Sequence, residues 1–331
     1  MPDPVLRLEG VAMHFPRHRS LGDVIRRRPV SVVKAVDGID LDVRAGEVVA
    51  IVGESGCGKT TAANVMMGIL TPTEGTVVVD GSDLSTLDGR SLRRARRHLQ
   101  MVFQDPYESL NPRMTVGTVV AEPLRVHRVA TSPEDEAARV TLALEQAGLR
   151  PPEMFAKRYP HELSGGQRQR VVVAAALVLQ PEVMIADEPV SMLDVSIRAD
   201  ILNLLASLAR DQGIALVMIT HDMSTVAAYA DRIAVMYLGR IVEIGRTRDV
   251  LAEPHHPYTK ALISVVPVPR PDRTRRRIIL TGETPDPARI PPGCRFSPRC
   301  PLAFDTCREV DPPPRAVGDG HLAACLLIDL E

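Results

Sequence analysis

The stretch VVAIVGESGCGKTT, residues 48–61, decides the fold. Its apolar first half is typical of a buried strand, and its glycine-rich second half leads into a helical pattern. Strand, glycine-rich loop and helix in this order are the context of a phosphate-binding loop, or P-loop. A chance match is the alternative, and the flanking strand and helix disfavour it.

Each residue of this loop has a predicted task. The glycines let the backbone curl, so that successive N–H groups point at phosphate oxygens. Lys59 supplies a positive charge between the β- and γ-phosphates, the Thr60 hydroxyl binds Mg²⁺, and Thr61 reaches the α-phosphate. The predicted nucleotide-binding set in the loop is Gly53, Ser55, Gly56, Gly58, Lys59, Thr60 and Thr61.

The composition favours a cytosolic α/β protein. Aromatic residues make up only 3% of the chain, so Val, Leu, Ile and Ala must fill the core, which suits parallel strands covered by helices. The net charge of −1 argues against general nucleic-acid binding. The N-terminus lacks the layout of a secretory signal, and the longest apolar run, VVVAAALVL, is too short to span a bilayer.

The apolar pattern predicts an alternation of strands and helices along the chain, and hence a mostly parallel sheet. The predicted strands are 6–15, 39–43, 47–53, 76–80, 98–104, 182–188 and 214–220; the predicted helices are 60–70, 133–148, 165–179, 196–212 and 224–230. The segment from about 105 to 165 has few strand patterns, which predicts a helical insertion. Of the chain's 28 prolines, 14 lie between residues 254 and 314, which predicts a domain boundary near residue 250.

The stretch VMIADEP, residues 183–189, is an apolar strand that ends in two acids. Asp187 is predicted to hold Mg²⁺ through its water shell, and Glu188 to polarise the water that attacks the γ-phosphate. His221 follows the predicted strand 214–220 and could orient the same water. Structural roles for the paired acids and for the lone histidine are the alternatives.

The stretch HELSGGQRQR, residues 161–170, narrows the kind of protein. Its serine and two glycines precede a helix and build a second N-terminus suited to phosphate. The chain already has one P-loop, so this second cradle must serve another nucleotide, and two subunits arranged head to tail are the simplest geometry. At this point the chain resembles the ATP-binding cassette (ABC) family, whose members bind and hydrolyse ATP with Mg²⁺.

The resemblance implies roles for further residues. Gln104, in VFQDP, matches the residue that senses the γ-phosphate, contacts Mg²⁺ and touches the transmembrane subunit. Asp194, in SMLD, matches the loop that crosses the dimer interface, and Phe15 or a neighbour matches the aromatic that stacks on adenine. The nucleotide of the partner subunit is then contacted by Ser164, Gly165, Gly166 and Gln167.

Four longer stretches resemble one branch of this family. They are FQDPYESLNPRMTVG, RYPHELSGGQRQR, MYLGRIVE and HHPYTKAL, and they are similar to the F-type ATPase subunit of oligopeptide and dipeptide importers. The resemblance implies a D-type partner ATPase in a heterodimer, two membrane permeases, an extracytoplasmic peptide-binding protein, and a peripheral location on the cytoplasmic face of the membrane.

The same resemblance implies the fold and its division into domains. The expected fold is that of a P-loop NTPase with a RecA-like core, an antiparallel β subdomain and a helical subdomain at about 105–165. These parts make up a nucleotide-binding domain over 1–250. A C-terminal extension of the oligopeptide-importer type, with a four-cysteine metal site, is expected over 251–331.

Four of the five cysteines lie in that extension: Cys294, Cys300, Cys307 and Cys325. Zinc sites usually bring ligands in pairs two to four residues apart, and no such pair exists here. Four thiolates can instead hold a cubane iron–sulfur cluster, and the resemblance favours [4Fe-4S]. Zinc and unmetallated thiols stay open. Arg295, Arg299 and Arg308 are predicted to offset the negative charge of the site, and nothing in the sequence places it near the nucleotide.

Other functions are weighed against peptide import. An importer of nickel or another small solute remains open, because permeases and binding proteins choose the cargo. A soluble cassette protein that acts on ribosomes or DNA is disfavoured, because the chain has a single P-loop and no long coiled coil. An exporter subunit is disfavoured by the HPYT stretch and the cysteines that follow it.

Overall fold

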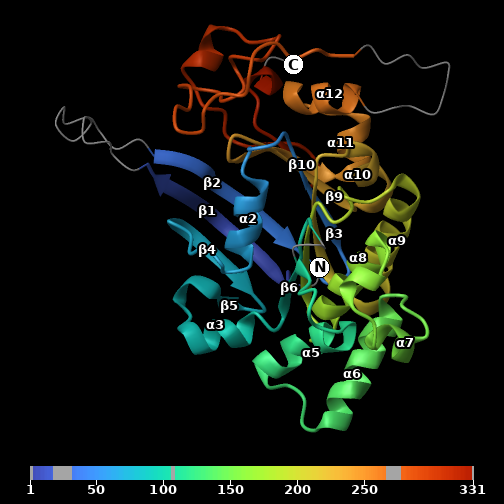
Figure 1. Cartoon of the computed structure of the whole chain (residues 1–331). Coiled ribbons are helices and arrows are strands. Elements are labelled where there is room, and N and C mark those ends of the chain that lie inside the picture. The colour runs from blue at the N-terminus through green and yellow to red at the C-terminus, as the bar shows by residue number, and fades with distance from the viewer. Residues whose placement is uncertain (1–2, 18–31, 106–108, 266–276, 330–331) are drawn as a thin grey trace. The chain divides into compact units, whose positions relative to one another are not determined.

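The structure is a computed structural model that describes residues 3–17, 32–105, 109–265 and 277–329 (Figure 1). By their contacts the residues group into two compact units. The first comprises Met1–Arg7, Asp42–Val48 and Val78–Ile219, and the second comprises Leu8–Leu41, Val49–Val77 and Thr220–Glu331. Among the described residues, no helix is long and apolar enough to cross a membrane.

The first unit contains a run of parallel strands. Its strands β6 (Leu99–Val102), β7 (Val183–Asp187) and β8 (Ala215–Thr220) pair in that order, and Val183 lies opposite both Leu99 and Ala215. Every residue of β7 and β8 is buried, as expected for parallel strands that are covered on both faces. Asp187, the last residue of β7, is therefore positioned by a fully buried strand.

Helices make up most of the rest of the first unit. They are α3 (Gly89–Ala95), α5 (Val116–His127), α6 (Pro133–Gln146), α7 (Pro152–Ala156), α8 (Gly165–Leu177) and α9 (Val195–Gln212). Figure 1 shows α5, α6 and α7, in green, as one cluster, and both α5 and α6 pack against α8. Thr115 and Ser132 cap the starts of α5 and α6 by accepting backbone hydrogen bonds.

The second unit contains strands from both ends of the chain. There β3 (Val48–Val52) pairs in parallel with β9 (Arg232–Tyr237), and β9 forms a hairpin with β10 (Arg240–Arg246). The next strand in the sheet is β12 (His321–Ala323), followed by β11 (Arg315–Gly318). The strands β1 (Leu6–Pro16), β2 (Val32–Val43) and β4 (Glu74–Val79) belong to a separate sheet, and β5 (Ser82–Asp83) pairs with the end of β4.

The helices of the second unit are short. They are α2 (Lys59–Met66), α10 (Met223–Tyr229), α11 (Thr247–Ala252) and α12 (Pro257–Ser264). Three fully buried aromatic side chains, Tyr237, Tyr258 and Phe296, pack together, with ring centres 4.8 Å apart for the tyrosines and 5.4 Å for Tyr258 and Phe296. Residues on both sides of position 250 therefore share one core.

The predicted elements agree with the structure where their pattern is strong. All seven predicted strands and all five predicted helices exist, and the parallel pairing of β3, β6, β7 and β8 with their neighbours confirms the α/β expectation. The β9–β10 hairpin was not predicted. It turns at Leu238 and Gly239, with φ angles of 41° and 80°, and a short turn between two apolar runs was the available signal.

Candidate functional site

The predicted P-loop, residues 53–58, lies between β3 and α2 in the second unit. Gly56 and Gly58 have φ angles of 79° and 109°, a region that favours glycine. A Cβ atom on Gly58 would lie 2.0 Å from the carbonyl oxygen of Ala35 in β2. The loop therefore packs against β2 at a position where no side chain fits.

Lys59 begins α2 and is only 7% exposed. Its Nζ donates hydrogen bonds to the carbonyl oxygens of Gly53, at 2.8 Å, and Glu54, at 3.0 Å. The side chain thus lies across the loop rather than in solvent. Ser55 and Thr60 are exposed and Thr61 is half-buried. The contacts of these residues with nucleotide and Mg²⁺ stay predictions.

The first unit brings two of the predicted catalytic residues together. Asp187 ends β7 and is 6% exposed. Glu188 follows with a φ of 45°, uncommon for a residue with a side chain and typical of functional sites, and its N–H donates to Ile219 O at 2.9 Å. Gln104 Nε2 donates to Glu188 Oε2 at 3.4 Å. Gln104 is thus within reach of the carboxylate that we predict to activate water.

The helix α8 starts at the predicted second phosphate cradle. The Ser164 hydroxyl accepts from the Gln167 N–H, and the Gln167 side chain accepts from the Ser164 N–H, so the two residues form a capping box. Gly165 and Gly166 form the first turn, and a Cβ atom on Gly166 would lie 2.5 Å from Cγ2 of Ile197 in α9. The cap fixes where the helix starts. The first turn of α8 contains no acidic residue that would repel a phosphate.

Asp194 is the N-cap residue of α9 and is exposed. Its neighbours Met192 and Val195 are 58% and 80% exposed, although both are apolar. Single exposed apolar side chains are common on any protein surface, so they do not test the predicted interface role of Asp194, which stays a prediction.

Two further predicted residues belong to the second unit. His221 follows β8 and is exposed, and the next residue, Asp222, caps α10 by accepting from Ser224 N–H at 2.8 Å. Phe15 lies near the end of β1 and is half-buried. The roles proposed for His221 at the γ-phosphate and for Phe15 at adenine stay predictions.

The four cysteines of the extension line one small cavity of about 10 Å³. All four are free thiols, and the cavity wall contains no Asp, Glu, Lys or Arg. Burial and the neighbouring thiols Cys307 and Cys325 raise the pKa of Cys294 to about 11. Burial likewise raises the pKa values of Cys300 and Cys325. These groups are therefore protonated thiols unless a cation replaces the protons.

The donor set fits a four-thiolate group in its composition, since four thiols, two of them buried and two half-buried, line one cavity. The space between them is about that of one water-sized sphere. Among the described residues, no three His, Cys, Asp or Glu side chains are arranged to hold a metal ion. A metal at these cysteines therefore stays a prediction.

Comparison with known proteins identifies the family. The model of the ABC transporter family matches residues 36–191, and that of the oligopeptide/dipeptide transporter C-terminal region matches residues 242–307. A probable peptide ABC transporter ATP-binding protein of Sinorhizobium fredii, y4tS, is 47% identical over 98% of this chain and 90% of its own. The chain belongs to the ABC transporter family.

Further relatives and solved structures agree with this assignment. The oligopeptide transport ATP-binding protein AppF of Bacillus subtilis is 45% identical over 98% of both chains. The ATP-binding cassette MJ0796, in a dimeric post-hydrolysis state bound to ADP and Pi, is 31% identical with a TM-score of 0.63, over 73% of this chain and 99% of that one. CbiO1 from Clostridium perfringens, part of the ABC transporter complex CbiONQ, is 29% identical with a TM-score of 0.64, over 76% and 92%. The expected ABC ATPase fold is confirmed.

In this ABC ATPase, sequence reasoning missed the contacts of the P-loop residue Glu54. Its N–H donates to Tyr258 Oη at 2.9 Å. Its carboxylate accepts from Arg299 Nη1 and Nη2, at 2.7 and 3.1 Å, and from Thr284 Oγ1 at 2.7 Å. Burial alone would raise the pKa of Glu54, but Arg299 and Thr284 outweigh it and lower that pKa.

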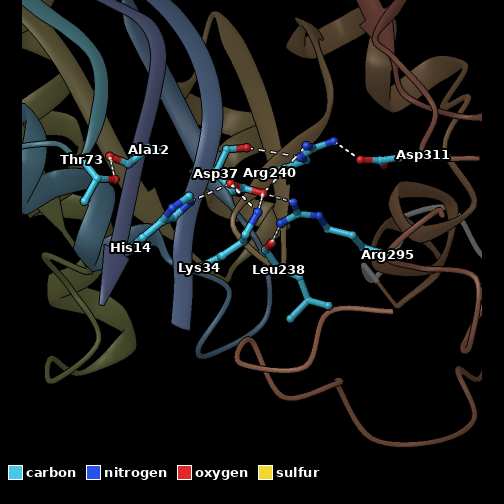
Figure 2. A network of polar contacts seen from close by, with 9 residues as sticks. All are labelled: Ala12, His14, Lys34, Asp37, Thr73, Leu238, Arg240, Arg295 and Asp311. Atoms are coloured by element: carbon cyan, nitrogen blue, oxygen red, sulfur yellow. Dashed lines mark hydrogen bonds and ion pairs between the residues drawn. The ribbon is translucent and has the colours of Figure 1, made fainter. Parts of the chain in front are cut away.

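A second cluster in this ABC ATPase surrounds Asp37 of β2, as Figure 2 shows. Its carboxylate pairs with Arg295, which also donates to the Leu238 carbonyl oxygen, and with His14 Nε2 at 2.7 Å. Burial would raise the pKa of Asp37, but Arg295, His14 and Lys34 together lower it to about 2. The carboxylate is therefore ionised at every physiological pH.

These clusters correct one expectation from the sequence. Arg295 and Arg299 were expected to offset negative charge at the cysteines, yet both bind carboxylates of other segments, Asp37 and Glu54. Neither arginine belongs to the wall of the four-cysteine cavity. The sequence alone does not place the cysteine segment near the predicted nucleotide site, whereas in the structure Arg299 of that segment contacts Glu54 of the P-loop.

Proposed function

We propose that this chain hydrolyses ATP to power the import of oligopeptides or dipeptides through a membrane ABC transporter. The match of residues 242–307 to the C-terminal region of oligopeptide/dipeptide transporters carries this proposal. Relatives that are 44–47% identical over nearly the whole chain, and that are named as peptide or oligopeptide transport ATP-binding proteins, support it. Nickel or another small solute is the alternative cargo.

The P-loop is proposed to hold the phosphates of ATP. In this proposal Lys59 leaves its two loop carbonyls for the β- and γ-phosphates, while Thr60 binds Mg²⁺ and Thr61 the α-phosphate. The low exposure of the Lys59 side chain supports this role, because a cation that is already held away from water loses less hydration when it binds a phosphate. Phe15 is proposed to stack on adenine. The backbone of Gly53, Ser55, Gly56 and Gly58 completes the cradle.

Hydrolysis is proposed to use residues at or just after the ends of the strands β6, β7 and β8. Glu188 polarises the attacking water, and His221 orients that water at the γ-phosphate. Gln104 contacts Mg²⁺, and Asp187 holds the ion through its water shell. The hydrogen bond from Gln104 to Glu188 supports the grouping of these two side chains. No covalent intermediate is needed, because the work is positioning and charge stabilisation.

We propose that two ATPase subunits close head to tail around ATP. The N-terminus of α8, with Ser164 to Gln167, then contacts the nucleotide of the partner subunit, and Asp194 crosses the interface. The partner is proposed to be a different, D-type chain. Two permeases, an extracytoplasmic peptide-binding protein and a location on the cytoplasmic face of the membrane complete the assembly.

We propose a [4Fe-4S] cluster at Cys294, Cys300, Cys307 and Cys325, with zinc as the alternative. Four thiols on one cavity wall support the cluster, which would replace the thiol protons, and those of Cys294, Cys300 and Cys325 are otherwise costly to remove. Iron, zinc and acid-labile sulfide should be measured per chain on protein purified without oxygen. Iron and sulfide that Cys300→Ser removes would support the cluster, whereas zinc alone or no metal would refute it.

The decisive prediction for the ATPase is Glu188→Gln. The amide can still accept a hydrogen bond from water but is a far weaker base, so we expect ATP hydrolysis to fall at least about a hundredfold while ATP remains bound. The measurement is ATP turnover and ATP-dependent peptide uptake in proteoliposomes that hold the complete transporter. Turnover at the wild-type rate would refute the role of Glu188, and uptake of nickel in place of peptide would refute the cargo.

A further inference from the structure

Arg299 is held rigidly in the segment that bears the cysteines. Its side chain is 9% exposed, and its guanidinium lies 6.0 Å from the ring centre of Tyr237. Its N–H donates to Phe296 O at 2.9 Å, in one of several consecutive turns between Cys294 and Cys300. The place of Arg299 is thus set by the same backbone that sets the place of two cysteines.

The contact between Arg299 and Glu54 is bidentate. A guanidinium that binds both oxygens of a carboxylate fixes the orientation of that carboxylate as well as its distance, which a lysine cannot do. Thr284 binds one of the same oxygens, and Tyr258 holds the Glu54 N–H. Side chain and backbone of this single P-loop residue are therefore both anchored from the C-terminal part of the chain.

Glu54 in turn anchors Lys59. The carbonyl oxygen of Glu54 accepts a hydrogen bond from Lys59 Nζ at 3.0 Å. A shift of Glu54 moves this carbonyl, and with it the position from which the ammonium group approaches a phosphate. The chain of contacts therefore runs from the cysteine segment through Arg299 and Glu54 to the cation of the P-loop.

We propose that Arg299 is a positioning residue for nucleotide binding, through which the four-cysteine segment sets the shape of the P-loop. This inference rests on the proposed role of the P-loop as the ATP site. It gives the extension a task within the ATPase itself: the arrangement of residues 294–300 controls the affinity for ATP.

The test is a double-mutant cycle on the full-length chain, with Arg299→Gln, Glu54→Gln and both together. Because the two side chains act through one contact, each single change is expected to weaken binding of a fluorescent ATP analogue with Mg²⁺ about tenfold, and the double variant no further. The KM for ATP rises in parallel, while kcat at saturating ATP is retained. Arg299→Lys is expected to bind the ATP analogue almost as weakly as Arg299→Gln does, since lysine keeps the charge but cannot bind both carboxylate oxygens.

Matched variants keep the outcome interpretable. Arg289→Gln changes an exposed arginine of the same extension and is expected to bind ATP as the wild type does. If Arg299→Gln fails to fold in thermal unfolding, Thr284→Val removes one bond to the same carboxylate and is expected to weaken binding about threefold.

Two results separate this inference from the proposed function. If Lys59→Ala binds the nucleotide as tightly as the wild type does, the P-loop is not the ATP site and the proposed function fails. If Lys59→Ala abolishes binding, but folded Arg299→Gln or Thr284→Val binds with wild-type affinity, the positioning role is refuted. Additive effects of Arg299→Gln and Glu54→Gln would also refute it.

Discussion

At the scale of single residues, His256 makes the fold sensitive to acid. It is 1% exposed and caps α12, where its Nδ1 accepts from the Tyr258 N–H at 3.1 Å. That bond requires a neutral ring, and burial, with a smaller contribution from Lys260, lowers its pKa from 6.5 to about 3. Between these two pKa values His256 is therefore neutral in the folded state and protonated in the unfolded state.

The sign of the resulting pH dependence follows from that depressed pKa. Between about pH 6.5 and pH 3 the unfolded chain binds more protons at this site, so the free energy of unfolding falls as the pH falls, by at most about 1.4 kcal/mol per pH unit. His256→Asn keeps a capping acceptor but does not titrate, so its thermal midpoint should fall less steeply over this interval. His161→Asn, at an exposed histidine, is the control, and equal slopes for His256→Asn and wild type would contradict the prediction.

At the scale of elements, the contact between the P-loop and β2 depends on one glycine. Gly56 and Gly58 both have positive φ angles, but only a Cβ atom at Gly58 would meet the backbone, at Ala35 O. We expect Gly56→Ala to cost about 1–2 kcal/mol of unfolding free energy, which is the cost of the left-handed backbone. Gly58→Ala should cost a further 1–3 kcal/mol, roughly, because the backbone oxygen cannot move aside.

The measurement for this pair is urea unfolding of both variants beside the wild type. Because the two glycines differ chiefly in what surrounds them, Gly56→Ala is the matched control for Gly58→Ala. Equal losses of stability in the two variants would show that the contact with β2 has no role. We also expect Gly58→Ala to bind ATP more weakly than Gly56→Ala does.

Elements also show which parts of the molecule the sequence predicts. The P-loop, β7 and α8 were predicted because each is a local pattern in which neighbours along the chain decide the structure. The anchor on Glu54 was not predictable, because Arg299 lies 245 residues further along the chain and nothing in either local sequence marks the pair. For the same reason, nothing in the sequence indicates that the cysteine segment contacts the P-loop.

At the scale of the whole molecule, the extension completes structures that begin before residue 250. Glu243 of β10 is 1% exposed and accepts from the N–H groups of His255 and His256, at 2.7 and 3.0 Å, and from His321 Nε2 at 2.9 Å. In addition β12 pairs with β10, so that Ala323 lies opposite Glu243. The boundary near residue 250 stays a prediction, but the contacts of the second unit run across it.

Removal of residues 251–331 is therefore expected to destabilise the remaining chain. It removes Arg295, Arg299 and His321, which are partners that Asp37, Glu54 and Glu243 have in the extension, and it exposes the edge of β10, which favours aggregation. The expected result, by thermal unfolding and size-exclusion chromatography, is a lower midpoint and aggregated protein. A truncated chain that stays monomeric with the wild-type midpoint would contradict it.

The pairing of β12 with β10 has a consequence for the evolution of this chain. Once a cassette relies on the extension for a strand of its sheet and for the arginines that pair with its carboxylates, cassette and extension can be inherited only as a matched set. A chimera that joins this cassette to the extension of a relative should fold only if the donor carries arginines suited to Asp37 and Glu54. Recombination that separates the two parts would then be selected against at the level of folding, before transport is ever tested.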